Sequence, residues 1–108
     1  MPIYNKLVRD HIPAVIERAG KTCTTRRLEK SEYIQELKKK SQEELTEYLQ
    51  ASDDESALEE LADLLEVIHA LAKCHGADIE EVERIRERKA EERGGFGERI
   101  FLVEVQDA

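Results

Sequence analysis

The chain has 108 residues, a length that fits one domain, so we expect residues 1–108 to form a single unit. A formal net charge of −8 argues against a general affinity for the nucleic acid backbone, which excludes a nucleic acid polymer as the expected partner. No apolar run approaches the roughly 18 residues of a membrane span, and no signal peptide is recognised. The sequence therefore predicts a soluble, cytoplasmic protein without a membrane partner.

A short helix, a strand and a long helix are predicted in the first half of the chain. Pro13 suits the first turn of a short helix that Gly20 brings to an end. The Thr-rich residues 22–28 favour a short strand. Ser31 is a favourable N-cap residue, and its position predicts a helix over residues 32–51.

Two further helices are predicted in the second half. A polar turn at residues 52–56 offers N-cap side chains to a helix that continues to about His75. Asp78 is the expected N-cap of the next helix, which ends near Arg93. Because the connections between these helices are short, neighbouring helices should run antiparallel.

The C-terminal region is predicted to be a loop followed by a strand. Residues 93–98 contain three glycines and cannot hold a helix. Residues 100–105, "IFLVEV", have strand character and can pair with residues 22–28. The expected fold class is all-α: an antiparallel helical bundle with a minor two-stranded β element.

One charged residue lies within the apolar face of the helix that ends near His75. At about 100° per residue, Glu60 points between Val67 and Leu71, and apolar residues cover roughly half of the helix circumference. A carboxylate in a buried face costs free energy unless it is paired or bound to a metal. Glu60 therefore needs a partner.

The preceding helix supplies candidate partners for Glu60. Glu44 and Glu47 are three residues apart and lie on one side of their helix, and Glu60 and Asp63 repeat that spacing. An antiparallel hairpin would bring the two pairs face to face, where four carboxylates ionise together only beside a cation. Oxygen ligands without Cys or His suit Mg²⁺, or alternatively Mn²⁺. Acids at this spacing are also common on solvated helix faces, which is the alternative interpretation.

Four segments resemble a known family. Residues 43–47, "EELTE", and 59–63, "EELAD", resemble the ExxE…ExxD metal signature of the MazG-like all-α nucleoside triphosphate pyrophosphatases. Residues 4–13, "YNKLVRDHIP", and 89–102, "KAEERGGFGERIFL", are similar to the two ends of its phosphoribosyl-ATP pyrophosphohydrolase-like branch. The resemblance implies Mg²⁺-dependent cleavage between the α- and β-phosphates, giving a monophosphate and pyrophosphate, in oligomers built from packed helix pairs.

The resemblance also implies roles for individual residues. The metal ligands would be Glu44, Glu47, Glu60 and Asp63. The residues expected to act in catalysis are Glu43, Glu44 and Glu60, with Glu43 and Glu59 placed to orient water. Substrate phosphates also need cations, and with the resemblance the expected phosphate-binding residues are Lys6, Arg9, Lys89 and Arg93. Lys40, one turn before Glu44 on the same helix, is a further candidate because of its position. The branch usually has Lys where this chain has His11, so no phosphate role is assigned there.

The sequence thus predicts an Mg²⁺-dependent pyrophosphohydrolase with a nucleotide, a nucleoside triphosphate, as substrate. One alternative is a phosphoribosyl-ATP pyrophosphatase of histidine biosynthesis, and another is a non-catalytic helical dimerisation module. The wide apolar face predicts at least a homodimer, whose partner subunit can contribute phosphate-binding cations. The residues expected to be partly buried by that subunit are Leu64, Val67, Ile68 and Leu71.

Overall fold

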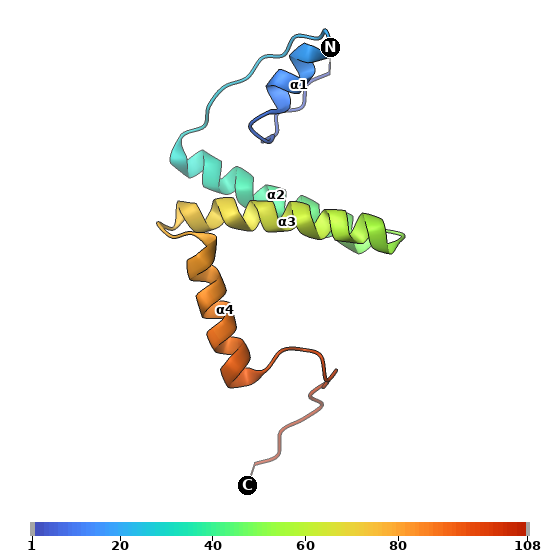
Figure 1. The fold of residues 1–108 in the computed structure, drawn as a ribbon, viewed down its shortest axis with the longest axis vertical. Helices are drawn as coiled ribbons and strands as arrows, with labels where there is room; N and C mark the ends of the chain where they lie inside the picture. Colours follow the sequence, from blue (N-terminus) through green and yellow to red (C-terminus); the bar gives the residue numbers. More distant parts are fainter. Residues whose placement is uncertain (1, 108) are drawn as a thin grey trace.

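The computed structural model describes residues 2–107, which form four helices and no strand (Figure 1). The helices are α1 (Ile12–Arg18), α2 (Lys30–Gln50), α3 (Asp54–Cys74) and α4 (Ile79–Arg93). The predicted all-α class is confirmed. Among the described residues, none of the helices is both long and apolar enough to cross a membrane.

Capping side chains fix where α3 and α4 begin. Asp53 accepts a hydrogen bond of 2.7 Å from the backbone N–H of Ser56, and Asp78 accepts one of 3.0 Å from that of Glu81. Each bond satisfies a backbone donor that the first turn of a helix leaves unpaired. Both N-caps are among the residues that the sequence offered for this role, and Gly76, at φ 73°, follows the end of α3.

The start of α2 differs from the prediction. Its N-cap is Glu29, which makes no side-chain cap, and Ser31 lies inside the helix. The preceding chain is held by Arg26, whose guanidinium forms hydrogen bonds of 2.8 and 3.2 Å to the carboxylate of Glu32 in the first turn. This bidentate ion pair replaces the predicted hydroxyl cap as the contact that holds the start of α2.

Helices α2 and α3 form an antiparallel hairpin, joined by three residues, 51–53 (Figure 1). Its buried apolar side chains are Leu37 from α2 and Val67 and Ala72 from α3. The hairpin is the only part of the described chain in which two helices pack along their lengths. Any site formed by residues of two helices packed side by side therefore lies on this hairpin.

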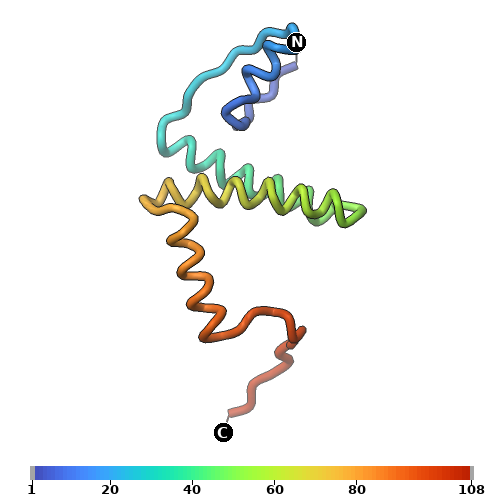
Figure 2. Tube along the Cα trace, in the orientation of Figure 1, coloured from blue at the N-terminus to red at the C-terminus, as the bar shows by residue number. Residues whose placement is uncertain are grey.

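Helix α4 turns away from the hairpin after Gly76 and contacts only α3 (Figures 1 and 2). The molecule is consequently extended, with dimensions of 67 × 36 × 23 Å and a radius of gyration of 18.8 Å. A compact chain of this length would have a radius of gyration of about 13 Å. Much apolar surface thus stays open in one copy of the chain.

The predicted two-stranded element is absent from the described residues. Residues 22–28 connect α1 to α2, and residues 100–105 follow α4 on the opposite side of the hairpin (Figure 2). The prediction of this pair was wrong for a single chain, because α4 carries the C-terminal segment away from residues 22–28. The strand propensity of residues 22–28 and 100–105 gave no information about the direction of α4, which separates them.

Five leucines of the hairpin remain open to solvent, and the exposed fractions of these residues range from 43% to 72%. They are Leu45, Leu49, Leu58, Leu61 and Leu65. Val67, by contrast, is 7% exposed and already covered within the chain, and its predicted interface neighbours Leu64, Ile68 and Leu71 are half-buried. The largest uncovered apolar area of the hairpin therefore lies on these five leucines, which we call the leucine face.

Candidate active site

The α2–α3 hairpin brings three carboxylates together. Glu44 and Glu47 come from the last two turns of α2, and Glu60 comes from the second turn of α3. One oxygen from each carboxylate lies within 4.8 Å of the other two. Because the helices are antiparallel and the connection is short, residues close to the turn on both helices face each other. We call these three residues the acidic cluster.

Two oxygens of the acidic cluster are buried without a hydrogen-bond partner. Glu44 is 8% exposed, and its Oε2 and the Oε2 of Glu60 are enclosed and unpaired among the described residues. Buried carboxylate oxygens nearly always accept a hydrogen bond or bind a cation, since they otherwise lose their hydration without replacement. These two unpaired oxygens thus indicate a binding site for a positively charged ligand.

Burial and the closeness of the carboxyl groups change the protonation of the acidic cluster. The pKa of Glu60 is raised to about 7, chiefly by a hydrogen bond with the Glu47 carboxyl, with burial and the charges of Glu47 and Glu44 adding to the effect. Burial, followed by the charge of Glu47, raises the pKa of Glu44. Without a cation the cluster therefore retains protons near neutral pH, while a bound cation would favour full ionisation.

The acidic cluster fits a hard divalent cation. Mg²⁺ binds oxygen at about 2.0–2.1 Å, so ligands on opposite sides of one ion are about 4.2 Å apart. The three carboxylate oxygens all lie within 4.8 Å of one another, which is short enough for ligands of one ion. The donor set contains only oxygen, the ligand type that Mg²⁺ and Mn²⁺ prefer. Neither Cys nor His takes part in this group of ligands.

Asp63, the fourth predicted ligand, binds a guanidinium instead. Its Oδ1 accepts a hydrogen bond of 2.7 Å from Nη2 of Arg9, which lies in the segment before α1. Asp63 is still near the acidic cluster, because its charge contributes to the raised pKa of Glu44. The structure thus places Arg9 beside the acidic cluster. It pairs this predicted phosphate-binding residue with Asp63, a predicted metal ligand.

Lys40 and Glu43 border the acidic cluster on α2. The Lys40 ammonium lies 3.6 Å from Oε2 of Glu43 and 3.9 Å from Oε1 of Glu44. Glu43 is exposed and does not belong to the set of three converging carboxylates. Among the predicted phosphate-binding residues, Lys40 therefore shares its helix with the buried Glu44 and lies 3.9 Å from its carboxylate.

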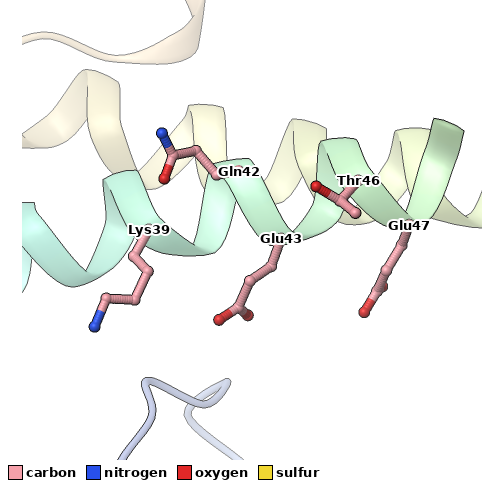
Figure 3. A pocket seen from close by; sticks show the side chains of 5 residues that line it. All are labelled: Lys39, Gln42, Glu43, Thr46 and Glu47. Atoms are coloured by element: carbon pink, nitrogen blue, oxygen red, sulfur yellow. The ribbon is translucent and has the colours of Figure 1, made fainter.

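A shallow, open depression runs along the outer side of α2 (Figure 3). Glu43 and Glu47 extend from the helix in the same direction, and the other lining residues are Lys39, Gln42 and Thr46. Sequence analysis did not single out these three, although the spacing of Lys39, Glu43 and Thr46 places them on one helix face. Glu47 thus belongs both to the acidic cluster and to this depression.

The remaining predicted cations lie outside the acidic cluster. Lys6 is in the N-terminal segment, with its ammonium 5.4 Å from the ring centroid of Tyr4. Lys89 and Arg93 are exposed residues of α4, which departs from the end of the hairpin opposite to the cluster (Figure 1). Glu60 and Cys74 are separated by about 21 Å along α3. Within one chain, Lys89 and Arg93 therefore do not reach the acidic cluster.

Comparison with protein families gives a match that covers most of the chain. A family model described as phosphoribosyl-ATP pyrophosphohydrolase matches residues 9–90, well over half of the chain. The match begins at Arg9, includes the acidic cluster and Asp63, and ends before Arg93. Searches of curated proteins and of solved structures found no match.

Proposed function

Because the chain belongs to the phosphoribosyl-ATP pyrophosphohydrolase family, within the MazG-like all-α superfamily, we propose that it is an Mg²⁺-dependent nucleotide pyrophosphohydrolase. Its substrate is a nucleoside triphosphate, which it cleaves between the α- and β-phosphates to give a monophosphate and pyrophosphate. The observation that carries this proposal is the acidic cluster, with its two unpaired buried carboxylate oxygens. A nucleoside triphosphate binds Mg²⁺ through its phosphate oxygens and would bring this ion to the acidic cluster.

Glu44, Glu47 and Glu60 would hold the metal, and Asp63 would join them once Arg9 has released it. A bound Mg²⁺ would neutralise the phosphate oxygens and stabilise the charge that develops on them. Through a bound metal, the acids would set the position of the anhydride relative to α2. They also keep the site free of other anions, because their own charge repels any anion that does not bring a cation.

Glu43 is the proposed proton acceptor. It is exposed beside the acidic cluster and lines the depression on α2 with Glu47. A water oxygen attacks a phosphorus of the α–β anhydride while its proton passes to the Glu43 carboxylate. The bond from that phosphorus to the bridging oxygen breaks, and its electron pair leaves with the departing phosphate group. Lys40, 3.6 Å from Glu43, is placed to contact a phosphate oxygen.

Arg9 and Lys6 would bind the remaining phosphate charge. Arg9 already lies against Asp63 beside the acidic cluster, so its guanidinium would be available to a phosphate bound there. Lys6 is three residues away on the same segment. Lys89 and Arg93 would act on the site of a partner subunit, since they lie far from the cluster of their own chain.

A second candidate substrate is phosphoribosyl-ATP, which the description of the matching family model favours. It contains the same α–β phosphate linkage as a nucleoside triphosphate. The acidic cluster and its neighbouring cations would act on both substrates in the same way. The two differ only in the phosphoribosyl group attached to the base.

A pyrophosphate-release assay tests the proposal. Nucleoside triphosphates, their deoxy forms and phosphoribosyl-ATP are compared in Mg²⁺, in Mn²⁺ and in EDTA. Glu60→Gln should lower turnover by at least about a hundredfold, the loss expected on removing a key electrostatic group. Glu66→Gln, an exposed acid on the same helix, is the matched control and should retain activity. A well-folded parent that releases no pyrophosphate from any substrate would favour the non-catalytic dimerisation module.

A further inference from the structure

Two irregular segments of the chain have unpaired backbones. Residues 22–28 and 100–107 contain no helix or strand, and neither segment makes a backbone hydrogen bond with another described residue. An extended segment of this kind presents a row of free N–H and C=O groups, which is the feature that allows an edge strand to pair with another chain. Both segments are thus available for β-pairing.

The C-terminal segment also exposes a dense apolar run. Five of the six residues at 100–105 are large and apolar, with 74–88% of their surface open. They are Ile100, Phe101, Leu102, Val103 and Val105. An uncovered run of this size marks a contact surface, and its β-branched and aromatic side chains favour a strand. We call residues 100–105 the C-terminal arm.

The charges of the two segments are complementary. Residues 21–28 contain Lys21, Arg26 and Arg27 and no acid, whereas residues 98–107 contain three acids and only one base, Arg99. Arg26 is occupied by Glu32, but Arg27 forms no ion pair with any described residue. Opposite charges on adjacent strands favour pairing, so residues 22–28 are a suitable partner for the C-terminal arm.

The arm cannot meet this partner within its own chain in the observed arrangement. Residues 22–28 lie beyond the α2–α3 hairpin on one side, and α4 directs the arm to the other side (Figures 1 and 2). A second copy of the chain offers the same residues 22–28 without this separation. A two-fold arrangement would then use both arms and both partner segments.

We propose that the C-terminal arm of one copy pairs as a β-strand with residues 22–28 of a second copy. The exchange satisfies both rows of backbone groups, covers the exposed apolar run and joins the segments of opposite charge. It rests on the structure of these segments and not on the catalytic proposal. An inactive protein can therefore form it, and an active protein can lack it.

Disulfide cross-linking between two differently labelled chains tests the exchange. One chain carries Cys74→Ala, so that Cys23 is its only thiol. The other carries Cys23→Ser and Cys74→Ala, with one cysteine introduced in turn at each position of 100–105. After mixing and mild oxidation, non-reducing gels should show the mixed dimer. Because side chains alternate along a strand, the yield should be high at every second position of the arm.

The control places the new cysteine in α4 instead, as Glu91→Cys, which is exposed and lies outside the arm. Yields along the arm no higher than for this control would overturn the proposal. A chain that carries Cys23 and an arm cysteine together should form dimers. If it forms an intrachain disulfide in dilute solution instead, the two segments meet within one copy and the exchange is equally overturned.

Charge reversal tests the complementarity and reveals the strand direction. Arg27→Glu should lower the cross-linking yield about two- to fivefold, the range expected for one cross-strand charge pair. A compensating Glu98→Arg in the other chain should restore the yield if the strands are antiparallel, and Glu104→Arg should restore it if they are parallel. If Arg27→Glu has no effect, or if neither change restores the yield, the charge argument is overturned.

Discussion

The Arg9 guanidinium donates a hydrogen bond of 2.7 Å to Asp63, and this ion pair connects the N-terminal segment with α3 beside the acidic cluster. Arg9 was expected to bind phosphate and Asp63 to bind metal. In the structure each neutralises the other. The ion pair therefore keeps both side chains at the site. If it opened, Asp63 would be free to bind the metal and Arg9 to bind a phosphate of the substrate.

Arg9→Ala should separate substrate binding from metal binding. We expect KM for the nucleotide to rise about tenfold or more, since a charge-assisted contact with phosphate is lost. Metal affinity should stay constant or increase by a few-fold, because the exposed pair with Asp63 contributes little free energy and its removal releases a carboxylate. Steady-state kinetics and Mn²⁺ titration measure the two effects.

Arg18→Ala provides the control for Arg9→Ala. Arg18 is an exposed arginine of α1 whose side chain, among residues 2–107, bonds only to the backbone carbonyl of Ala14, at 3.4 Å. Its removal should change neither KM nor metal affinity. A marked loss of Mn²⁺ binding in Arg9→Ala would show that the ion pair organises the metal site, contrary to the role assigned here.

The acidic cluster should make the metal-free protein less stable as pH rises. The pKa of Glu60 is raised to about 7 and that of Glu44 is raised as well, so the folded state binds more protons than the unfolded state. The stability that these groups contribute is complete below pH 4.5 and is lost as pH rises through about 7. In EDTA, the parent should therefore lose Tm over this range relative to Glu60→Gln.

Mg²⁺ should reverse this loss. Binding to the folded state alone stabilises it by mass action, so the Tm of the parent at pH 8 should increase with Mg²⁺ concentration. Glu60→Gln should respond weakly, and the control Glu66→Gln should behave as the parent does. Parallel Tm profiles for parent and Glu60→Gln in EDTA would show that the Glu60 carboxyl does not have a raised pKa in the folded protein.

Spacing along the chain predicted the acidic cluster because the required information is local. Residues three apart share a helix face, and a short connection forces two such faces together. Glu44, Glu47 and Glu60 follow from these two facts alone. The contact of Asp63 with Arg9 does not, because it joins residues 54 positions apart through a segment without regular structure.

Three other features could not be read from the sequence, for related reasons. The path of α4 is set by the turn at Gly76, and periodicity does not encode its direction. The pairing of residues 100–105 with residues 22–28 was therefore expected within one chain, and the described residues do not contain it. The interface was placed on residues such as Val67 because a wide apolar arc does not reveal which part the neighbouring helix covers. In the structure α2 covers Val67 and leaves Leu61 open.

Lys89 and Arg93 should act in trans. Each lies far from the acidic cluster of its own chain, so a site with phosphate-binding cations from α4 requires a second subunit. Lys89→Ala together with Arg93→Ala should lower activity without removing Mn²⁺ binding. Mixing this variant with Glu60→Gln should restore about a quarter of the parent activity, since half of the dimers are mixed and each has one complete site.

A matched control for this complementation is Arg86→Ala. Arg86 lies on α4 and pairs with Glu83 of the same helix at 2.8 Å. It should be fully active alone, because its charge is already neutralised within the helix. If the mixture of the two variants shows no more activity than the variants alone while exchange of subunits is demonstrated, the cations of α4 do not serve a neighbouring site.

The leucine face should hold the subunits together. Leu49 and Leu61 lie on its two helices and are 72% and 43% exposed in one copy of the chain. A carboxylate placed there would be buried without a partner in a dimer, at a cost of several kcal/mol. Leu49→Glu and Leu61→Glu should therefore shift the molar mass in light scattering toward that of one chain. Val15→Glu, an equally exposed apolar site on α1, is the control and should keep the parent mass. A parent that is monomeric and fully active across micromolar dilution would contradict both the leucine face as an interface and the shared site.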